Sequence, residues 1–390
     1  MDSLRNPFSP GAGSPPYELA GRDTVVNDVM TAIRRTALGR SSKHMVLMGL
    51  RGVGKTVLLG EIRRRAESEG QVVVLIEAPE DRSLPALLSP LLRLALLKIS
   101  RTEAARELAY RGLRVLAGFV SATKVKYSDI EVTLDLEPEQ GTADNGDLEL
   151  DLADVVEAVG EAAKGSGKAL VIMIDELQYL PATQLGPLVA ALHRCSQNQL
   201  PVTLVGAGLP NIRGHLGNSK TYAERLFDFR SISTLTPDAT RDAVIKPLAA
   251  EGVGITTDAL DRIISDTHGY PYFIQEFGKH AWDVAEQTPV THQDVEAARE
   301  FAEATLDASF FGVRFDRVST SEREYLRAMA ELGPGPHQSA DIAIAMGKSL
   351  QAVASIRSRL IQKGMLWSPS HGEVAFTVPM FDEYLRRIMK

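Results

Sequence analysis

The feature that most constrains this chain is an eight-residue run, Gly49-Leu-Arg-Gly-Val-Gly-Lys-Thr56, which fits the pattern G-x-x-x-x-G-K-[ST]. An apolar run, Met45-Val-Leu-Met48, precedes it and a helical pattern follows it, which is the strand–loop–helix setting that the pattern requires. Glycines leave room for backbone N–H groups to wrap a phosphate, and the start of the helix adds the positive end of a dipole. The sequence therefore predicts a loop that binds the phosphates of a nucleotide.

Each residue type within this loop has an expected role. Lys55 would reach the β- and γ-phosphates, and the hydroxyl of Thr56 would ligate Mg²⁺. We therefore expect ATP with Mg²⁺ to be the bound species. The residues expected to surround the phosphates are Gly49, Arg51, Gly52, Val53, Gly54, Lys55, Thr56 and Val57.

A second apolar run ends in two acids, Leu170-Val-Ile-Met-Ile-Asp175-Glu176. A buried strand of this sequence would present Asp175 at its carboxyl edge beside the phosphate loop, where it can hold the shell of Mg²⁺. Glu176 would then orient and polarise the attacking water. We expect Lys55 and Glu176 to be catalytic and Thr56 and Asp175 to bind the metal.

Short apolar runs alternate with helical patterns from Leu19 to Leu235, which predicts an α/β fold with a parallel sheet and helices on both faces. Helical patterns alone follow Pro237 and predict an all-α lid. Short helices, a longer helix at Ser349–Lys363 and a hairpin around Pro369–Gly372 then predict a C-terminal winged helix. The strands are expected at Met45–Met48, Val72–Glu77, Leu170–Asp175, Val202–Gly206 and Phe229–Ser233.

In this order the motifs resemble those of the AAA+ and STAND-like P-loop ATPases, and they are similar to archaeal and bacterial ATPases related to origin-recognition replication initiators. Leu19-Ala-Gly-Arg22-Asp23 resembles the box near the N-terminus of those proteins, where the backbone around the adenine is set. His268-Gly269-Tyr270-Pro271 resembles the G-x-P motif of their lid. The resemblance implies ATP hydrolysis and adds Arg22, Gly269 and Pro271 to the expected binding residues.

The resemblance also implies a catalytic residue supplied by a neighbouring copy. Tyr222-Ala-Glu-Arg225 resembles the segment that carries the arginine finger of these ATPases, so Arg225 is expected to act in trans. Two family features are missing. The run Val202–Gly208 does not end in a polar residue, and none follows until Asn211; Tyr272 stands where the initiators often have an arginine sensor. These departures favour a slow ATPase that works as a switch.

The patterns divide the 390 residues into four parts. They are a flexible arm at 1–18, a P-loop ATPase domain at 19–236, a helical lid domain at 237–312 and a winged-helix domain at 313–390. The ATPase domain holds an insertion at 83–165, interpreted as extra helices and an acidic hairpin or loop. Its stretch 128–161 contains twelve Asp or Glu and no Lys or Arg, which makes it either a solvated surface or a contact for a partner.

The longer helix of the winged-helix domain offers a candidate surface for double-stranded DNA. At 100° per residue, Lys348, Arg359 and Lys363 fall within one sector of about 60°, whereas Arg357 points away. A face of this kind would contact phosphates. Winged helices also serve as packing modules beside a nucleotide lid, so a protein partner or self-association stays open.

Composition narrows the cellular compartment and the kinds of partner that we expect for this chain. The net charge of −7 argues against non-specific nucleic-acid binding by the whole surface, and the single Cys195 excludes a disulfide framework and suits a reducing compartment. The most apolar stretch, Leu84–Ile99, contains prolines and charges and is shorter than the ~20 residues a bilayer requires. We therefore expect a cytoplasmic protein with no membrane partner.

Two functions fit these observations. One is an ATP-dependent switch coupled to DNA binding or remodelling through the winged helix. The other is a STAND-type signalling or defence regulator whose output is a protein partner. A small-molecule P-loop kinase fits poorly, because phosphorylation of a metabolite needs neither the lid motif nor a terminal winged helix.

Overall fold

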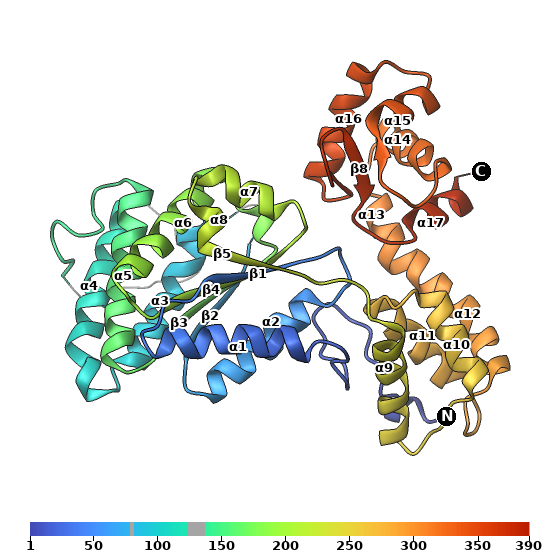
Figure 1. Cartoon of the computed structure of the whole chain (residues 1–390), viewed down its shortest axis with the longest axis horizontal. Helices are drawn as coiled ribbons and strands as arrows, with labels where there is room; N and C mark the ends of the chain where they lie inside the picture. The colour runs from blue at the N-terminus through green and yellow to red at the C-terminus, as the bar shows by residue number, and fades with distance from the viewer. Residues whose placement is uncertain (79–81, 124–136, 390) are drawn as a thin grey trace.

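The structure is a computed structural model that describes residues 1–78, 82–123 and 137–389. Figure 1 shows three bodies along the chain: a sheet domain in blue to green, a helical lid in yellow and a C-terminal domain in orange to red. We use these three names for residues 19–236, 237–312 and 313–390. The two chain ends lie on the side of the lid and the C-terminal domain, away from the sheet.

A five-stranded parallel sheet forms the centre of the sheet domain, with the strand order β2-β3-β4-β1-β5. The strands are β1 (His44–Met48), β2 (Val72–Glu77), β3 (Leu170–Asp175), β4 (Val202–Gly208) and β5 (Phe227–Ser231). All five expected strands are present, although β5 begins two residues before the predicted Phe229. Strand β4 lies between β1 and β3, so an additional strand separates the two motif-bearing strands.

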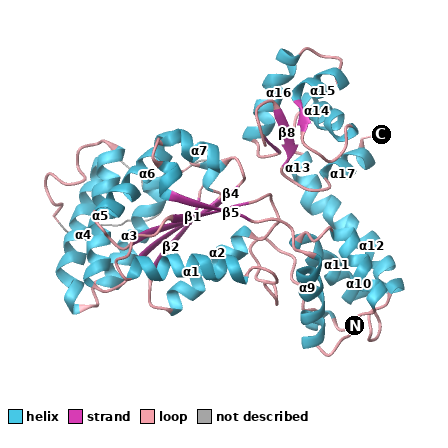
Figure 2. Cartoon of the chain, in the orientation of Figure 1, coloured by secondary structure: helices cyan, strands magenta, loops and turns pink. Residues whose placement is uncertain are grey.

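Helices cover both faces of this sheet, as predicted (Figure 2). One face carries α1 (Asp23–Ala37) and α2 (Lys55–Ser68), and the other carries α3 (Leu84–Ile99), α4 (Arg106–Ala122), α5 (Leu148–Gly165) and α6 (Ala182–Gln197). Two shorter helices, α7 (Ile212–Ser219) and α8 (Ala223–Leu226), precede β5. Strand β1 is consequently buried on both sides: Met45 and Leu47 join one apolar cluster, and Val46 and Met48 join the other.

The insertion at 83–165 supplies α3, α4 and α5 to one face of the sheet. Its helices fall where the sequence predicts them, and α5 begins after Asp147, whose carboxylate caps the helix. The hairpin expected around Ile130–Leu136 lies outside the described residues. Of the helices that the structure does describe, α3 included, none combines the length and apolar character needed to cross a membrane.

The lid consists of α9 (Pro237–Ala250), α10 (Thr257–Thr267), α11 (Pro271–Val284) and α12 (His292–Thr305). A π-helical stretch, Leu306–Gly312, continues α12 directly into α13 (Val313–Phe315). The predicted boundary between residues 312 and 313 therefore falls inside an unbroken helical segment. We call residues 306–315 the linker helix, and π-helical turns of this kind occur frequently at functional sites.

The C-terminal domain contains three helices followed by a β-hairpin and a closing helix. They are α14 (Thr320–Glu331), β6 (His337–Gln338), α15 (Ser339–Ala345), α16 (Leu350–Gln362), β7 (Leu366–Trp367), β8 (Glu373–Phe376) and α17 (Phe381–Ile388). The strands form a small antiparallel sheet in the order β6-β8-β7. Apart from β6, which the sequence did not predict, these elements follow the predicted order, and α16 is the longer helix expected at Ser349–Lys363.

Residues 1–18 correct an expectation, because they pack against the lid rather than forming a loose arm. Phe8 is only 4% exposed, and its ring occupies space left by Gly278 of α11, where an added Cβ would lie 2.5 Å from the ring. Asn6 donates to the carbonyl of Lys279, and the indole of Trp282 donates to the carbonyl of Asp2. The sequence of this segment did not reveal these anchors.

Phe8→Ala should release this arm from the lid. Truncating a buried Phe typically costs about 3–5 kcal/mol, more than the few hydrogen bonds along the arm can offset. We expect faster amide hydrogen exchange in residues 1–16, measured by mass spectrometry. Leu4→Ala is the matched control, because Leu4 lies on the same arm and is 94% exposed. Unchanged protection in Phe8→Ala would contradict the anchoring role.

Candidate functional site

The loop between β1 and α2 adopts a conformation that requires glycine. Gly52 and Gly54 have φ of +80° and +92°, in the left-handed region that side chains disfavour. Gly49 is needed for a different reason, since a Cβ there would lie 2.3 Å from the carbonyl oxygen of Ile232. The glycine spacing in the motif therefore follows from the backbone path, and α2 starts at Lys55 with its free N–H groups at the loop.

The ammonium of Lys55 is buried within this loop. The side chain is 5% exposed, and Nζ donates to the carbonyl oxygens of Gly49 (3.0 Å) and Leu50 (2.9 Å). Burial lowers the pKa of Lys55, while the nearby carboxylates of Glu176 and Asp175 oppose that shift. Neutral carbonyls are weaker partners for a cation than phosphate oxygens, so this ammonium is available for a triphosphate.

The hydroxyl of Thr56 donates to a carboxylate oxygen of Asp175 at 2.6 Å, which joins the two motifs. Burial raises the pKa of Asp175, and the hydrogen bonds from Thr56 and from the N–H of Glu176 oppose that shift. Hydroxyl and carboxylate oxygens are ligands that Mg²⁺ accepts, with phosphates and water completing its shell. The two predicted metal residues therefore fit the ion, and within the described residues no cluster of three or more His, Cys, Asp or Glu offers another site.

Glu176 follows directly and is held at both carboxylate oxygens. Gln178 donates to Oε2, and the guanidinium of Arg51 lies 3.9 Å from Oε1. The backbone of Glu176 has a φ of +50°, which is unusual for a residue with a side chain. The local conformation thus departs from the regular strand at the point where the expected catalytic carboxylate occurs.

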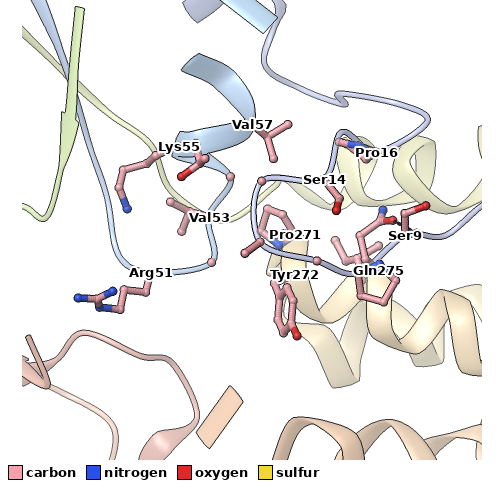
Figure 3. A pocket seen from close by; sticks show the side chains of 18 of the residues that line it. Ser9, Ser14, Pro16, Arg51, Val53, Lys55, Val57, Pro271, Tyr272 and Gln275 are labelled. Atoms are coloured by element: carbon pink, nitrogen blue, oxygen red, sulfur yellow. Dashed lines mark hydrogen bonds between the residues drawn. The ribbon is translucent and has the colours of Figure 1, made fainter. Parts of the chain in front are cut away.

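A cavity of about 480 Å³ opens beside the loop, within the size range of small-ligand sites (Figure 3). Its wall comes from the arm, the sheet domain, the lid and the linker helix. In Figure 3, Ser9 and Ser14 of the arm face Tyr272 and Gln275 of α11 across from Lys55. The predicted site residues in the wall are Arg22, Arg51, Gly52, Val53, Gly54, Lys55, Thr56, Val57, Asp175, Glu176 and Pro271.

Three predicted residues lie outside this wall. Gly49 packs closely against the carbonyl of Ile232. Gly269 fixes the start of the lid helix α11, since its carbonyl accepts from the N–H of Leu235 at 2.8 Å. Arg225 is exposed on α8 and does not reach the cavity of its own chain. Arg22 lines the wall but also buttresses the loop, because its guanidinium donates to the carbonyls of Val53 and Ser233.

Sequence reasoning missed a cation in the linker helix, Arg314. It lines the cavity, and its guanidinium stacks over the ring of Phe310 with 4.3 Å between guanidinium carbon and ring centre. Burial lowers the pKa of Arg314 to about 10, with Arg51 and Arg317 adding to the shift. Arg51, Lys55 and Arg314 therefore surround the cavity with positive charge, which suits a polyphosphate. Arg314 was assigned to the C-terminal domain by the predicted boundary at residue 313. The sequence around it contains no motif that would place the linker beside the phosphate loop.

The phosphate loop is also in contact with both other domains. The N–H of Arg51 donates to the carbonyl of Thr377 in the C-terminal domain (3.2 Å), and the hydroxyl of Tyr270 in the lid donates to the carbonyl of Arg51 (2.8 Å). The Arg51 guanidinium donates to the hydroxyl of Tyr179 at 2.5 Å. Gly364 lies against this guanidinium, since an added Cβ would be 2.8 Å from Nη2. Arg51, expected only to line the site, thus links it to the C-terminal domain.

The predicted basic face of α16 is turned toward α14. Of the three cations expected on this face, only Arg359 lies within α16, since Lys348 precedes the helix and Lys363 follows its last residue; each of the three pairs with an acid of α14. The side-chain nitrogen of Lys348 lies 3.1 Å from a carboxylate oxygen of Glu324. Side-chain nitrogens of Arg359 and Lys363 lie 3.3 and 2.7 Å from carboxylate oxygens of Glu322. Glu322 is 1% exposed. Burial raises its pKa, but hydrogen bonds from Lys363 and Ser319 outweigh burial and lower the pKa.

The fold and the site together define a P-loop nucleotide-binding protein of the class with an additional strand between its two motif strands. Residues 18–205 match the family described as the AAA ATPase domain, and the protein is an ATPase. Residues 308–385 match a family described as a domain of unknown function (DUF8462). The search of the curated proteins found no match.

Solved structures share the whole architecture at low sequence identity. A Walker-type ATPase of Pyrococcus abyssi is 16% identical, with a TM-score of 0.61 over 97% of this chain and 99% of that one. The ORC2 protein of Aeropyrum pernix is also 16% identical, with a TM-score of 0.55 over 97% of this chain and 96% of that one. At this identity the likeness concerns the fold alone.

Lys55→Ala should abolish measurable ATP binding in a titration calorimeter. The change removes the buried ammonium, and hydrogen bonds to charged groups contribute about 1.5–3 kcal/mol each. Losing two of them weakens affinity by on the order of 100-fold or more. Arg63→Ala is the control, because Arg63 lies on the same helix but is exposed. Near-normal affinity in Lys55→Ala would contradict the assignment of this loop as the phosphate site.

Proposed function

We propose that the protein is a nucleotide-dependent switch that binds ATP with Mg²⁺ in the cavity, hydrolyses it and transmits the nucleotide state to the C-terminal domain. One observation carries this proposal: Arg51 of the phosphate loop is hydrogen-bonded to Thr377 of that domain and lies beside the catalytic carboxylate of Glu176. A change at the phosphates therefore has a direct physical path to the C-terminal domain.

The chemistry follows from the positions of the side chains. The ammonium of Lys55 would exchange the carbonyls of Gly49 and Leu50 for phosphate oxygens. Thr56 and Asp175 would hold Mg²⁺, which neutralises charge on the phosphates when bound. Glu176 would accept a hydrogen bond from the attacking water and polarise it. Arg314 would approach the phosphates from the linker helix, where its reduced solvation strengthens an ion pair.

Coupling requires contacts that differ between nucleotide states. A γ-phosphate would attract the guanidinium groups of Arg51 and Arg314, which both line the cavity, one in the loop and the other in the linker. Arg51 would then leave Tyr179 and Glu176, and the contact with Gly364 would change with it. The C-terminal domain would respond because Gly364 packs against this guanidinium, next to the backbone hydrogen bond between Arg51 and Thr377.

The output of the switch is better explained by a protein partner than by DNA. The DNA hypothesis depends on Lys348, Arg359 and Lys363, and all three are paired with acids of α14. Freeing Arg359 and Lys363 for phosphates would leave the buried Glu322 carboxylate without partners, which is costly. The winged-helix order of the C-terminal domain then serves packing beside the site, as in the regulator hypothesis.

The switch can be tested by labelling Ser68→Cys on α2 and Ser358→Cys on α16, which are exposed, while the native Cys195 is buried. Electron-spin distance measurements should give different distributions with ADP and with a slowly hydrolysed ATP analogue. Identical distributions would contradict the switch. Fluorescence anisotropy on the same protein should show no nucleotide-dependent binding of duplex DNA. Tight DNA binding that is lost in the Lys348→Glu variant would instead support DNA as the output of the switch.

Glu176→Gln should retain ATP affinity and lose turnover. An amide cannot take up a proton or polarise water as a carboxylate does, so we expect phosphate release to fall by about 10²–10⁴-fold. The readouts are steady-state phosphate release and calorimetric affinity. Glu67→Gln, a half-buried acid of α2 that pairs with Arg63 outside the cavity wall, is the control. Unchanged turnover would remove Glu176 from the catalytic role.

We propose that Arg225 is an arginine finger supplied by a neighbouring copy, and the same assays of turnover and affinity test this role. Its exposure on α8 leaves it accessible to such a copy. Arg225→Ala alone should lower turnover with normal affinity. Mixing it with Glu176→Gln should restore part of the activity, because one interface then combines both native residues. No recovery at any ratio would indicate that Arg225 does not act in trans.

A further inference from the structure

The side chain of Gln178 connects the expected catalytic carboxylate to the neighbouring strand. Gln178 lies two residues after Glu176 in a short 3-10 turn, Leu177–Tyr179. Its Oε1 accepts from the N–H of Leu209 at 3.0 Å, directly beyond β4, and its Nε2 donates to Oε2 of Glu176. An amide is suited to this position, because it offers an acceptor and a donor side by side.

The end of β4 is shaped to admit this amide. A Cβ on Gly208 would lie 2.7 Å from Oε1 of Gln178, and a Cβ on Gly206 would lie 2.8 Å from the side chain of Leu177. Glycine weakens a strand and often marks a close approach of another group. The strand has no polar side chain between Thr203 and Asn211, and Gln178 supplies a polar group at that edge from the adjacent turn.

Gln178 acts through Glu176 rather than on the nucleotide. Glu176 lines the cavity, whereas Gln178 is not among the described residues of the cavity wall. The other contact to the carboxylate comes from Arg51, at 3.9 Å from Oε1, and Arg51 itself faces the cavity. When a phosphate attracts Arg51, the hydrogen bond from Gln178 is the contact that still fixes the carboxylate.

We propose that Gln178 is a positioning residue for hydrolysis: its amide fixes the carboxylate of Glu176 relative to the end of β4, so that the carboxylate meets the attacking water. This inference rests on the proposed role of Glu176 as the group that activates water. It requires the amide nitrogen in particular, because the N–H of Leu209 needs only an acceptor, whereas Glu176 needs a donor.

Two substitutions separate these needs. Gln178→Glu keeps an acceptor for Leu209 but replaces the donor with a second carboxylate facing Glu176, whereas Gln178→Ala removes both contacts. Small displacements of a reacting group cost up to about 10²-fold, so we expect kcat to fall about 10- to 100-fold in both variants. Gln178→Glu should be at least as slow as Gln178→Ala. KM and the calorimetric Kd for ATP should remain at wild-type values.

A double-mutant cycle tests whether Gly208 serves the same contact. Gly208→Ala should lower kcat by displacing the amide of Gln178, but it should cost little more in the Gln178→Ala background. Contacting residues show such non-additive effects, whereas independent ones add. Fully additive losses would overturn the proposal. Thermal melts of each variant show whether a loss of turnover reflects unfolding.

Gln71→Ala is the matched control for a glutamine that supports the sheet. Its Oε1 accepts from the N–H of Ala169 at 2.8 Å at the opposite end of the same sheet, and its Nε2 donates to the carbonyl of Glu69. We expect kcat to be unchanged in this variant. A loss equal to that of Gln178→Ala would overturn the positioning role, as would wild-type or raised kcat in Gln178→Glu.

The proposed function and this inference fail in different ways. If Glu176→Gln hydrolyses ATP normally, the catalytic assignment of Glu176 is wrong and the role of Gln178 loses its basis. If Glu176→Gln is inactive while both Gln178 variants keep full kcat, only the positioning role is wrong.

Discussion

The hydrogen bond between the Thr56 hydroxyl and the Asp175 carboxylate is the interaction on which the rest of the site depends. Its two residues follow β1 and end β3, which are separated by β4, so the bond forms only when all three strands end at one edge. The register ensures this, because Met48 pairs with Gly208 and Ile174 pairs with Gly206. Asp175 and Lys55 are both buried, and each carries a charge that burial alone disfavours. Sheet register and the paired charges therefore stabilise the same arrangement.

Those parts of the site that follow from local pattern could be predicted from the sequence. Apolar runs mark the strands, and the parallel alternation brings their carboxyl ends to one edge. Lys55, Thr56, Asp175 and Glu176 therefore meet as predicted. Gly52 and Gly54 take the left-handed conformation, which is compatible with the glycines that the motif requires. Each of these residues lies within or next to the strand or helix that determines its position, so spacing along the chain was sufficient.

The contacts that the sequence could not provide join segments far apart in the chain. Phe8 packs on Gly278, and Arg314 reaches the cavity because a π-helical linker carries it there. The helical wheel assigned Lys348, Arg359 and Lys363 to one face, yet α16 begins only at Leu350, and a wheel carries no information about which element covers a face. Glu322, near the start of α14, forms ion pairs with Arg359 and Lys363 and thereby turns these two cations toward α14. Periodicity gives the direction of a side chain, and only the tertiary fold gives its partner.

The C-terminal domain contacts both the linker helix and the phosphate loop. The chemical nature of each contact indicates which of the two a change of nucleotide can break. On the linker side the contact is aromatic: Phe311 stacks near Tyr384 at 5.2 Å between ring centres and lies 5.9 Å from Phe381. On the loop side it consists of the Arg51–Thr377 hydrogen bond and the approach of Gly364 to a guanidinium. A hydrogen bond contributes a net ~0.5–1.5 kcal/mol, within what differential binding of ATP and ADP can overcome, whereas separating buried aromatic side chains costs several times more. If the protein works as the proposed switch, we therefore expect the linker helix and the C-terminal domain to stay together and their contact with the phosphate loop to be the one that breaks.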